Sequence, residues 1–145
     1  MVVLVIDAQG GGLGKQLIAG IKKEIPDATV WAVGTNAVAA SNMLKAGADR
    51  GAAGENAVVV ACRQADVIVG PVGICIADAM LGEITPAMAA AVGSSTARRI
   101  LIPYNNCETT IVGVGENSVG KLVQEVILEI QGGRRSGLQE KGEKC

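Results

Sequence analysis

Apolar residues along the chain follow two patterns, short continuous runs and longer stretches in which they recur every three or four positions. The run Val2–Asp7 is typical of a buried parallel strand, because β-branched side chains follow one another without a polar break. Leu13–Ile25 is typical of an amphipathic helix, because its leucines and isoleucines fall on one face and Lys22 and Lys23 fall away from it. The chain therefore begins with a predicted strand followed by a predicted helix.

The same alternation predicts further elements as far as residue 130. We expect strands at Ala28–Gly34, Asp49–Ala52, Asp66–Gly70, Arg98–Pro103 and Thr109–Val114. We expect helices at Asn36–Ala46, Glu55–Arg63, Pro86–Val92 and Ser118–Ile130. Valines in the segment Glu55–Arg63 would also suit a strand, but the better strand directly downstream favours the helix.

Residues typical of helix starts and helix ends support several of these boundaries. Thr35 is the expected cap of the helix that follows it, and Gly47 is its expected stop. Thr85 and Pro86 predict another helix start, with threonine as cap and proline in the first helical position. Strands that alternate with helices predict an α/β fold, a doubly wound, mostly parallel Rossmann-like sheet with helices on both faces.

Length and composition limit the domain organisation. The 145 residues are enough for one domain with a real core. We assign residues 1–131 to a single Rossmann-like domain. Residues 132–145 are rich in Gly, Arg, Lys, Glu and Ser and predict a disordered tail.

Composition also excludes several classes of function. A net charge of −1, one Trp and no Phe give neither a basic surface nor stacking platforms, so we expect no nucleic-acid partner. Met1 leads directly into a strand and the longest apolar stretch is too short to span a bilayer, so we expect a cytoplasmic protein without a membrane partner. The absence of histidine excludes Ser–His and Cys–His dyads, and we expect no metal site. The four cysteines are expected to be reduced.

Polar and glycine-rich segments follow four of the predicted strands, namely Asp7–Lys15, Gly34–Asn36, Gly70–Gly73 and Pro103–Glu108. Ligands of doubly wound sheets bind outside the carboxyl ends of the strands. The four segments meet at that edge in the predicted fold. The sequence therefore places a binding site there.

The first of these segments contains four glycines within five positions, Gly10, Gly11, Gly12 and Gly14, followed by Lys15. Glycine allows a ligand to approach the backbone closely, and the start of a helix offers free N–H donors. The pattern predicts binding of a phosphate-bearing small molecule. The alternative is that the glycines only form a tight turn and let the helix pack closely.

This loop matches neither of the two standard phosphate motifs. A P-loop needs glycine where Gln9 stands and a hydroxyl where Gln16 stands. The dinucleotide motif has glycine where Lys15 stands and an acidic residue near Thr35 and Asn36. NAD is therefore disfavoured, whereas a nucleotide or a dinucleotide such as NADP stays open as cofactor.

The candidate binding residues all belong to these segments. They are Asp7, Gln9, Gly10, Gly11, Gly12, Gly14, Lys15, Thr35, Asn36, Gly70, Pro71 and Gly73. Lys15 could neutralise a phosphate or be a solvated side chain. Asp7 could bind a ribose or act as a base, and it could equally accept hydrogen bonds from loop amides.

Other reactive residues have structural interpretations of their own, and we assign no catalytic residue. Cys107 could be a nucleophile, but we prefer a loop cysteine, and Cys75 is expected in the core. Glu55 and Glu83 lie near helix starts, where the helix dipole explains an acid. The residues after Tyr104 lack the lysine of a short-chain dehydrogenase.

Several segments together resemble a known family. They are Asp7–Lys15, Gly34–Ala37, Leu44–Ala48, Gly54–Ala57, Gly70–Gly73 and Met80–Pro86. The resemblance covers about the first 130 residues. It points to an uncharacterised bacterial family that is catalogued as a domain of unknown function. It implies a Rossmann-like cytoplasmic domain and no particular reaction.

Three functional hypotheses follow. The first is a protein that binds a nucleotide or another phosphate-bearing metabolite through Gly10–Gly14. The second is a non-enzymatic homo-oligomeric module that self-associates through the Ala- and Met-rich segment Ile74–Val92. The third is a small-molecule enzyme that uses Asp7 or Glu83 for acid/base chemistry.

Overall fold

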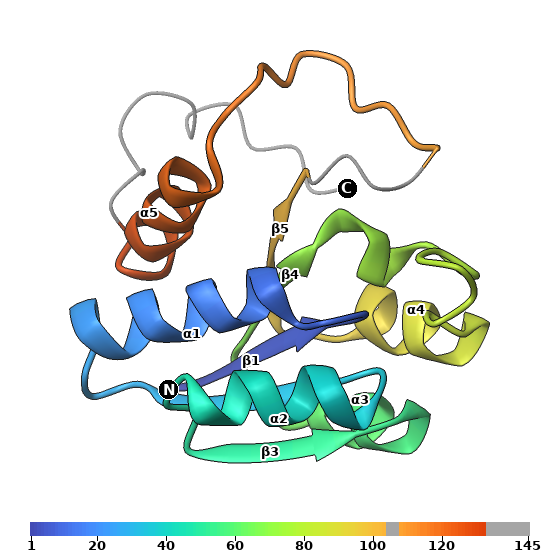
Figure 1. Ribbon diagram of the computed structural model, residues 1–145, viewed down its shortest axis with the longest axis horizontal. Coiled ribbons are helices and arrows are strands. Elements are labelled where there is room, and N and C mark those ends of the chain that lie inside the picture. Colours follow the sequence, from blue (N-terminus) through green and yellow to red (C-terminus); the bar gives the residue numbers. More distant parts are fainter. Residues whose placement is uncertain (104–107, 133–145) are drawn as a thin grey trace.

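The computed structural model describes residues 1–103 and 108–132 and contains a five-stranded parallel sheet between two layers of helices (Figure 1). The strands lie in the order β3-β2-β1-β4-β5. The elements are β1 (Val2–Asp7), α1 (Gly12–Glu24), β2 (Thr29–Gly34), α2 (Ala37–Lys45), β3 (Arg50–Ala53), α3 (Glu55–Cys62), β4 (Val67–Pro71), the 3₁₀ helix η1 (Val72–Cys75), α4 (Pro86–Ser94), β5 (Arg98–Ile102) and α5 (Val119–Ile130). The prediction of a doubly wound α/β fold is confirmed.

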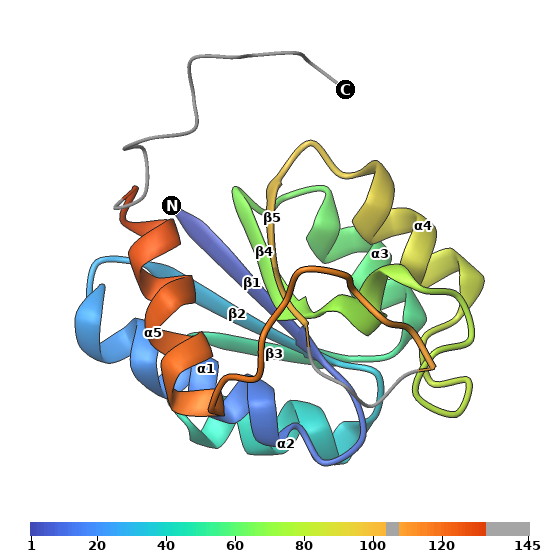
Figure 2. The same ribbon diagram turned by 90° about the horizontal axis from the view of Figure 1, so that it is seen from above.

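The sheet is buried on both faces, which explains the continuous apolar runs in its central strands. Helices α1, α2 and α5 cover one face, and α3 and α4 cover the other (Figure 2). Alternate residues of β1 enter the two cores, Val3 and Val5 on the side of α1 and Leu4 and Ile6 on the side of α3 and α4. All four are fully buried. The hydrophobic effect on both faces therefore fixes the register of the central strand.

The strand order places the switch in winding direction at β1. This strand pairs with β2 on one side and with β4 on the other. The carboxyl end of β1 lies beside that of β2, because Asp7 is opposite Gly34 in the register. In doubly wound sheets, the crevice outside such a switch point is the usual place of a ligand.

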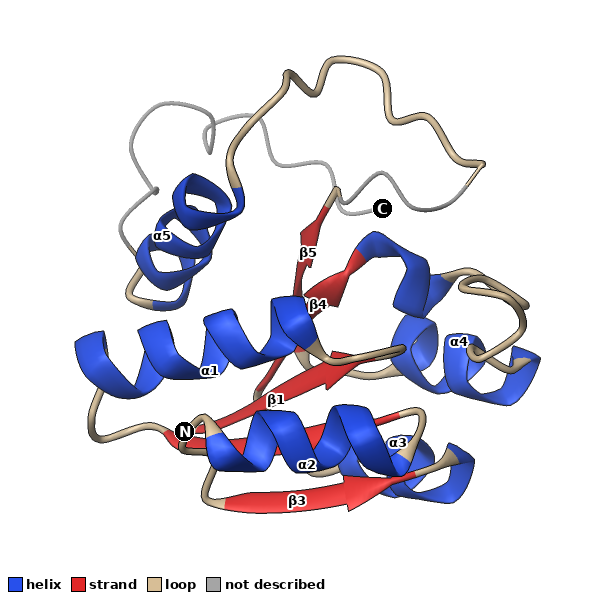
Figure 3. Ribbon diagram, viewed as in Figure 1, coloured by secondary structure: helices blue, strands red, loops and turns tan. Residues whose placement is uncertain are grey.

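The expected elements are confirmed with one exception. Thr109–Val114 was predicted to be a strand, and the structure shows a loop there (Figure 3). Val112 is 93 % exposed and Gly113 has a φ of +87°, so this short β-branched run neither joins the sheet nor enters the core. The prediction was wrong because β propensity reflects packing on a sheet rather than an intrinsic preference of the backbone.

The predicted cap of α4 is confirmed, the predicted cap of α2 is wrong, and Ser118 is a cap that was not predicted. Thr85 and Ser118 accept hydrogen bonds from Met88 N and Lys121 N at the starts of α4 and α5. The cap of α2 is Asn36, whose Oδ1 accepts from Ala39 N at 2.9 Å, and not Thr35 as predicted. The hydroxyl of Thr35 has another partner, described below.

No helix among the described residues is long and apolar enough to cross a membrane. The predicted tail lies outside the described residues from residue 133 onward.

Candidate functional site

Three segments that are distant in the sequence meet at the carboxyl edge of the sheet around the carboxylate of Glu83. Both of its oxygens accept a hydrogen bond from Gln9 N at 3.1 Å, in the loop after β1. Its Oε1 also accepts from Thr35 Oγ1 at 2.8 Å and from Asn36 Nδ2 at 2.7 Å, directly after β2. Glu83 itself lies between β4 and α4. One acidic side chain therefore connects the loops that follow three strands.

Of the two interpretations of Glu83, complementation of the dipole of the following helix is wrong, because the first turn of α4 contains no acidic residue. The carboxylate of Glu83 binds donors after β1 and β2 instead. The sequence offered one signal, since Glu83 is an acid on the segment that follows β4 at the predicted ligand edge. Glu55, in contrast, lies in the first turn of α3 as predicted, where it complements the helix dipole.

The loop that brings Glu83 to this position has an unusual backbone. Asp78, Met80 and Leu81 all have positive φ values between +56° and +64°, a region that costs non-glycine residues free energy. Ile84, which is fully buried, anchors the end of the loop, and its carbonyl accepts from Asp78 N at 2.7 Å. Backbone conformations of this kind cluster at functional sites.

The charge state of Glu83 follows from its surroundings. Partial burial favours the neutral acid, but the hydrogen bonds from Thr35, Asn36 and Gln9 together outweigh it and lower the pKa of Glu83 below its ordinary value. Glu83 is therefore ionised at neutral pH. The loops at the carboxyl edge of the sheet therefore surround a negative charge with hydrogen-bond donors.

The four glycines of the loop after β1 divide into two pairs. A Cβ on Gly11 would lie 2.9 Å from the backbone of Ala39, and Gly11 has a φ of +70°. A Cβ on Gly14 would lie 2.3 Å from Met43 Sδ. Both positions therefore need glycine because α1 packs closely against α2.

Gly10 and Gly12 have no such explanation. A Cβ at either position would meet nothing within 4 Å, and neither residue has a positive φ. Both are exposed, at the start of α1 and next to the carboxyl end of β1. Packing therefore does not explain why Gly10 and Gly12 are glycines, and both leave the backbone accessible at this edge of the sheet.

The side chain of Asp7 connects the two ends of the glycine turn by hydrogen bonds. This side chain is buried, with Oδ1 accepting from Ala8 N at 2.8 Å and Oδ2 accepting from Gly14 N at 2.7 Å. Burial raises the pKa of Asp7, and these amide hydrogen bonds only partly oppose it. Of the two interpretations of Asp7, the hydrogen bonds to loop amides are the one seen in the structure.

The remaining candidate residues lie around this edge in different environments. Lys15 is exposed in the first turn of α1 and forms no ion pair with any residue that the structure describes. Gly70, Pro71 and Gly73 are buried at the end of β4 and in η1. A Cβ on Gly70 would lie 2.5 Å from the carbonyl oxygen of Ile6, so packing explains this glycine.

The described cysteines belong to the core rather than to the site. Burial raises the pKa of Cys62 to about 11, and burial also raises the pKa of Cys75. Both thiols are therefore protonated at neutral pH and are poor nucleophiles. Cys75 packs against the core cluster on the side of α3 and α4, as predicted. Tyr104 and Cys107 lie outside the described residues.

The fold is that of a doubly wound α/β protein, and the ionised carboxylate of Glu83 lies near its switch point. The chain belongs to the family described as domain of unknown function DUF3842, whose model matches residues 2–133. No curated protein and no solved structure matches the chain. The resemblance to an uncharacterised family is thus confirmed.

Proposed function

We propose that the protein binds a nucleotide or another phosphate-bearing small molecule, with the phosphate on the backbone amides of Gly10 and Gly12. The main support is that these two glycines face open space while Gly11 and Gly14 are required by packing. Their location at the start of α1 adds the positive end of a helix dipole. The alternative of a purely structural turn explains only half of the glycines.

Lys15 fits the same proposal. A lysine in the first turn of a helix is slightly unfavourable with respect to the dipole, and here it has no acidic partner among the described residues. A bound phosphate would supply the missing negative charge. We therefore assign Lys15 to the phosphate.

Glu83 favours a nucleotide over a bare phosphate. Dinucleotide sites have an acid at the end of the second strand that accepts hydrogen bonds from ribose hydroxyls. The segment after β2 has only the neutral Thr35 and Asn36, but Glu83 brings a carboxylate to this same position. Its negative charge would repel a 2′-phosphate, so we expect nucleotides with free ribose hydroxyls to bind better than NADP.

The other two hypotheses receive less support. Ile74, Ile84, Met88 and Val92 are buried in the core of their own chain. Only Leu81, which is 98 % exposed, and the half-buried Ile76 and Met80 are available for self-association among the large apolar side chains of the segment Ile74–Val92. Asp7 is buried and both its carboxylate oxygens accept hydrogen bonds from amides, which leaves it poorly placed as a base. Glu83 is more exposed, but its lowered pKa makes it a weak base. Self-association stays a prediction, and we propose no reaction.

Replacing Lys15 with alanine is expected to weaken nucleotide binding about fivefold, as for the loss of one exposed charge pair. The measurement is a thermal-shift panel of nucleotides and sugar phosphates that includes ADP and NADP. A ligand at a hundredfold excess over its dissociation constant stabilises the protein by about 2.7 kcal/mol.

Lys23→Ala is the matched control, because Lys23 lies at the opposite end of the same helix. It should bind like the wild type. The proposal fails if no phosphate-bearing ligand in the panel raises the melting temperature, or if the two lysine variants respond alike.

A further inference from the structure

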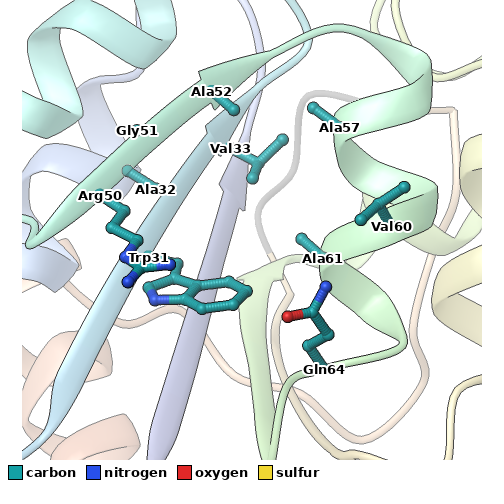
Figure 4. A pocket seen from close by; sticks show the side chains of 10 residues that line it. All are labelled: Trp31, Ala32, Val33, Arg50, Gly51, Ala52, Ala57, Val60, Ala61 and Gln64. Atoms are coloured by element: carbon teal, nitrogen blue, oxygen red, sulfur yellow. The ribbon is translucent and has the colours of Figure 1, made fainter.

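A concave region lies on the opposite face of β2 and β3 from α2. It is a groove of about 310 Å³ between these strands and α3, with Trp31 and Arg50 on the strand side and Ala57, Val60 and Gln64 on the helix side (Figure 4). This volume is at the lower end of the range of small-molecule sites. The groove exists because α3 crosses from β3 to β4 and leaves the exposed edge strand β3 uncovered.

Two hydrogen-bond donors on the strand side of this groove have no acceptor among the described residues (Figure 4). Trp31 Nε1 is buried and has no hydrogen-bond partner among the described residues. Arg50 stacks on the indole, with its Cζ 5.5 Å from the ring centre, and forms no ion pair with any residue in the described part of the chain. An unpaired buried donor costs free energy, which an acceptor from a ligand would recover.

The rest of the groove is apolar. The methyl groups of Ala52, Ala57, Val60 and Ala61 line it, and Gln64 is the one other polar side chain there. A ligand that fits must therefore combine one small anionic acceptor with an apolar body. A single guanidinium balances a single negative charge, and its planar donors match a carboxylate.

We propose that this groove binds a small carboxylic acid with an apolar body. The carboxylate accepts hydrogen bonds from Arg50 and, once the guanidinium has moved off the indole, from Trp31 Nε1. The apolar part packs against α3. This site does not depend on the proposed nucleotide site, which lies at the carboxyl edge of the sheet.

Trp31 is the only tryptophan of the chain, so its fluorescence reports on the groove directly. The test titrates the protein with hexanoate and, in parallel, with hexan-1-ol, which has the same apolar body without the charge. We expect a saturable change in fluorescence with hexanoate. Hexan-1-ol is expected to bind about tenfold more weakly or worse.

Arg50→Gln should weaken hexanoate binding about tenfold, judged from the midpoint of the titration and not from its amplitude. Arg63→Gln removes an equally exposed arginine next to the C-terminal end of α3 and should leave the midpoint unchanged. The inference is overturned if hexanoate causes no saturable change, if the alcohol binds equally well, or if both arginine variants behave alike. It is also overturned if Trp31 fluorescence follows protein concentration instead of hexanoate, because a second copy of the chain would then occupy the groove.

Discussion

Gly34→Ala is expected to lower the free energy of unfolding by about 3 kcal/mol. The added Cβ would lie 2.5 Å from Ala40 N and 2.7 Å from Asn36 O. Both atoms belong to the backbone at the start of α2, so a side-chain rotation cannot relieve the clash. Either α2 must move away from the sheet or β2 must distort. Equilibrium unfolding in urea, monitored by circular dichroism, measures the loss.

Gly12→Ala is the matched control for this variant. The same methyl group is added to a glycine in the first turn of α1, where nothing lies within 4 Å. The free energy of unfolding should stay within about 1 kcal/mol of the wild type, with a gain favoured because alanine restricts the unfolded chain. Similar losses in the two variants would contradict the division of the glycines into packing and open positions.

Asp7→Ala should destabilise the protein by about 2–4 kcal/mol, because it leaves the N–H groups of Ala8 and Gly14 without their acceptor. The glycine turn would lose the side chain that connects its two ends. Asp7→Asn keeps one oxygen acceptor and should lose less. The same urea unfolding experiment compares the two variants, and equal losses would show that the carboxylate oxygens do not organise the turn.

The pH dependence of these variants has a defined sign. Burial raises the pKa of Asp7 in the folded state above its ordinary value of 3.8. A raised folded-state pKa stabilises the protein fully below about pH 3.8, and this stabilisation is lost as the pH rises through the folded-state value. The advantage of the wild type over Asp7→Asn should therefore decrease from acid toward neutral pH. Glu83 has the opposite dependence and is present in both proteins, so the comparison largely cancels it.

Hydrophobic periodicity was sufficient to predict the sheet and its helices. The leucines and isoleucines of α1 were assigned to one face from their spacing alone, and Leu13, Leu17, Ile18 and Ile21 are buried. The same reasoning failed at Thr109–Val114, because a strand exists only if a neighbouring strand accepts its hydrogen bonds. It failed again at Thr35, whose hydroxyl would suit a helix cap but donates to Glu83, 48 residues away.

The candidate site could be predicted only in outline. Its edge of the sheet followed from the order of strands and polar loops, and the glycines after β1 were visible as a cluster. The roles of individual glycines depend on Ala39 and Met43 of α2, which the local sequence does not reveal. The contact between Gln9 and Glu83 spans 74 residues and depends on the positive-φ loop that precedes Glu83.

The central claim is that the backbone amides of Gly10 and Gly12 hold a phosphate. Amide resonances of the ¹⁵N-labelled protein, followed by NMR during a titration with ADP, test it most directly. We predict saturable shifts at Gly10 and Gly12, while Gly93 and Gly132, which are also exposed but lie at the C-terminal ends of α4 and α5, stay in place. Saturable binding of ADP that leaves the Gly10 and Gly12 amides unshifted would contradict the claim, and so would a spectrum that does not respond to ADP.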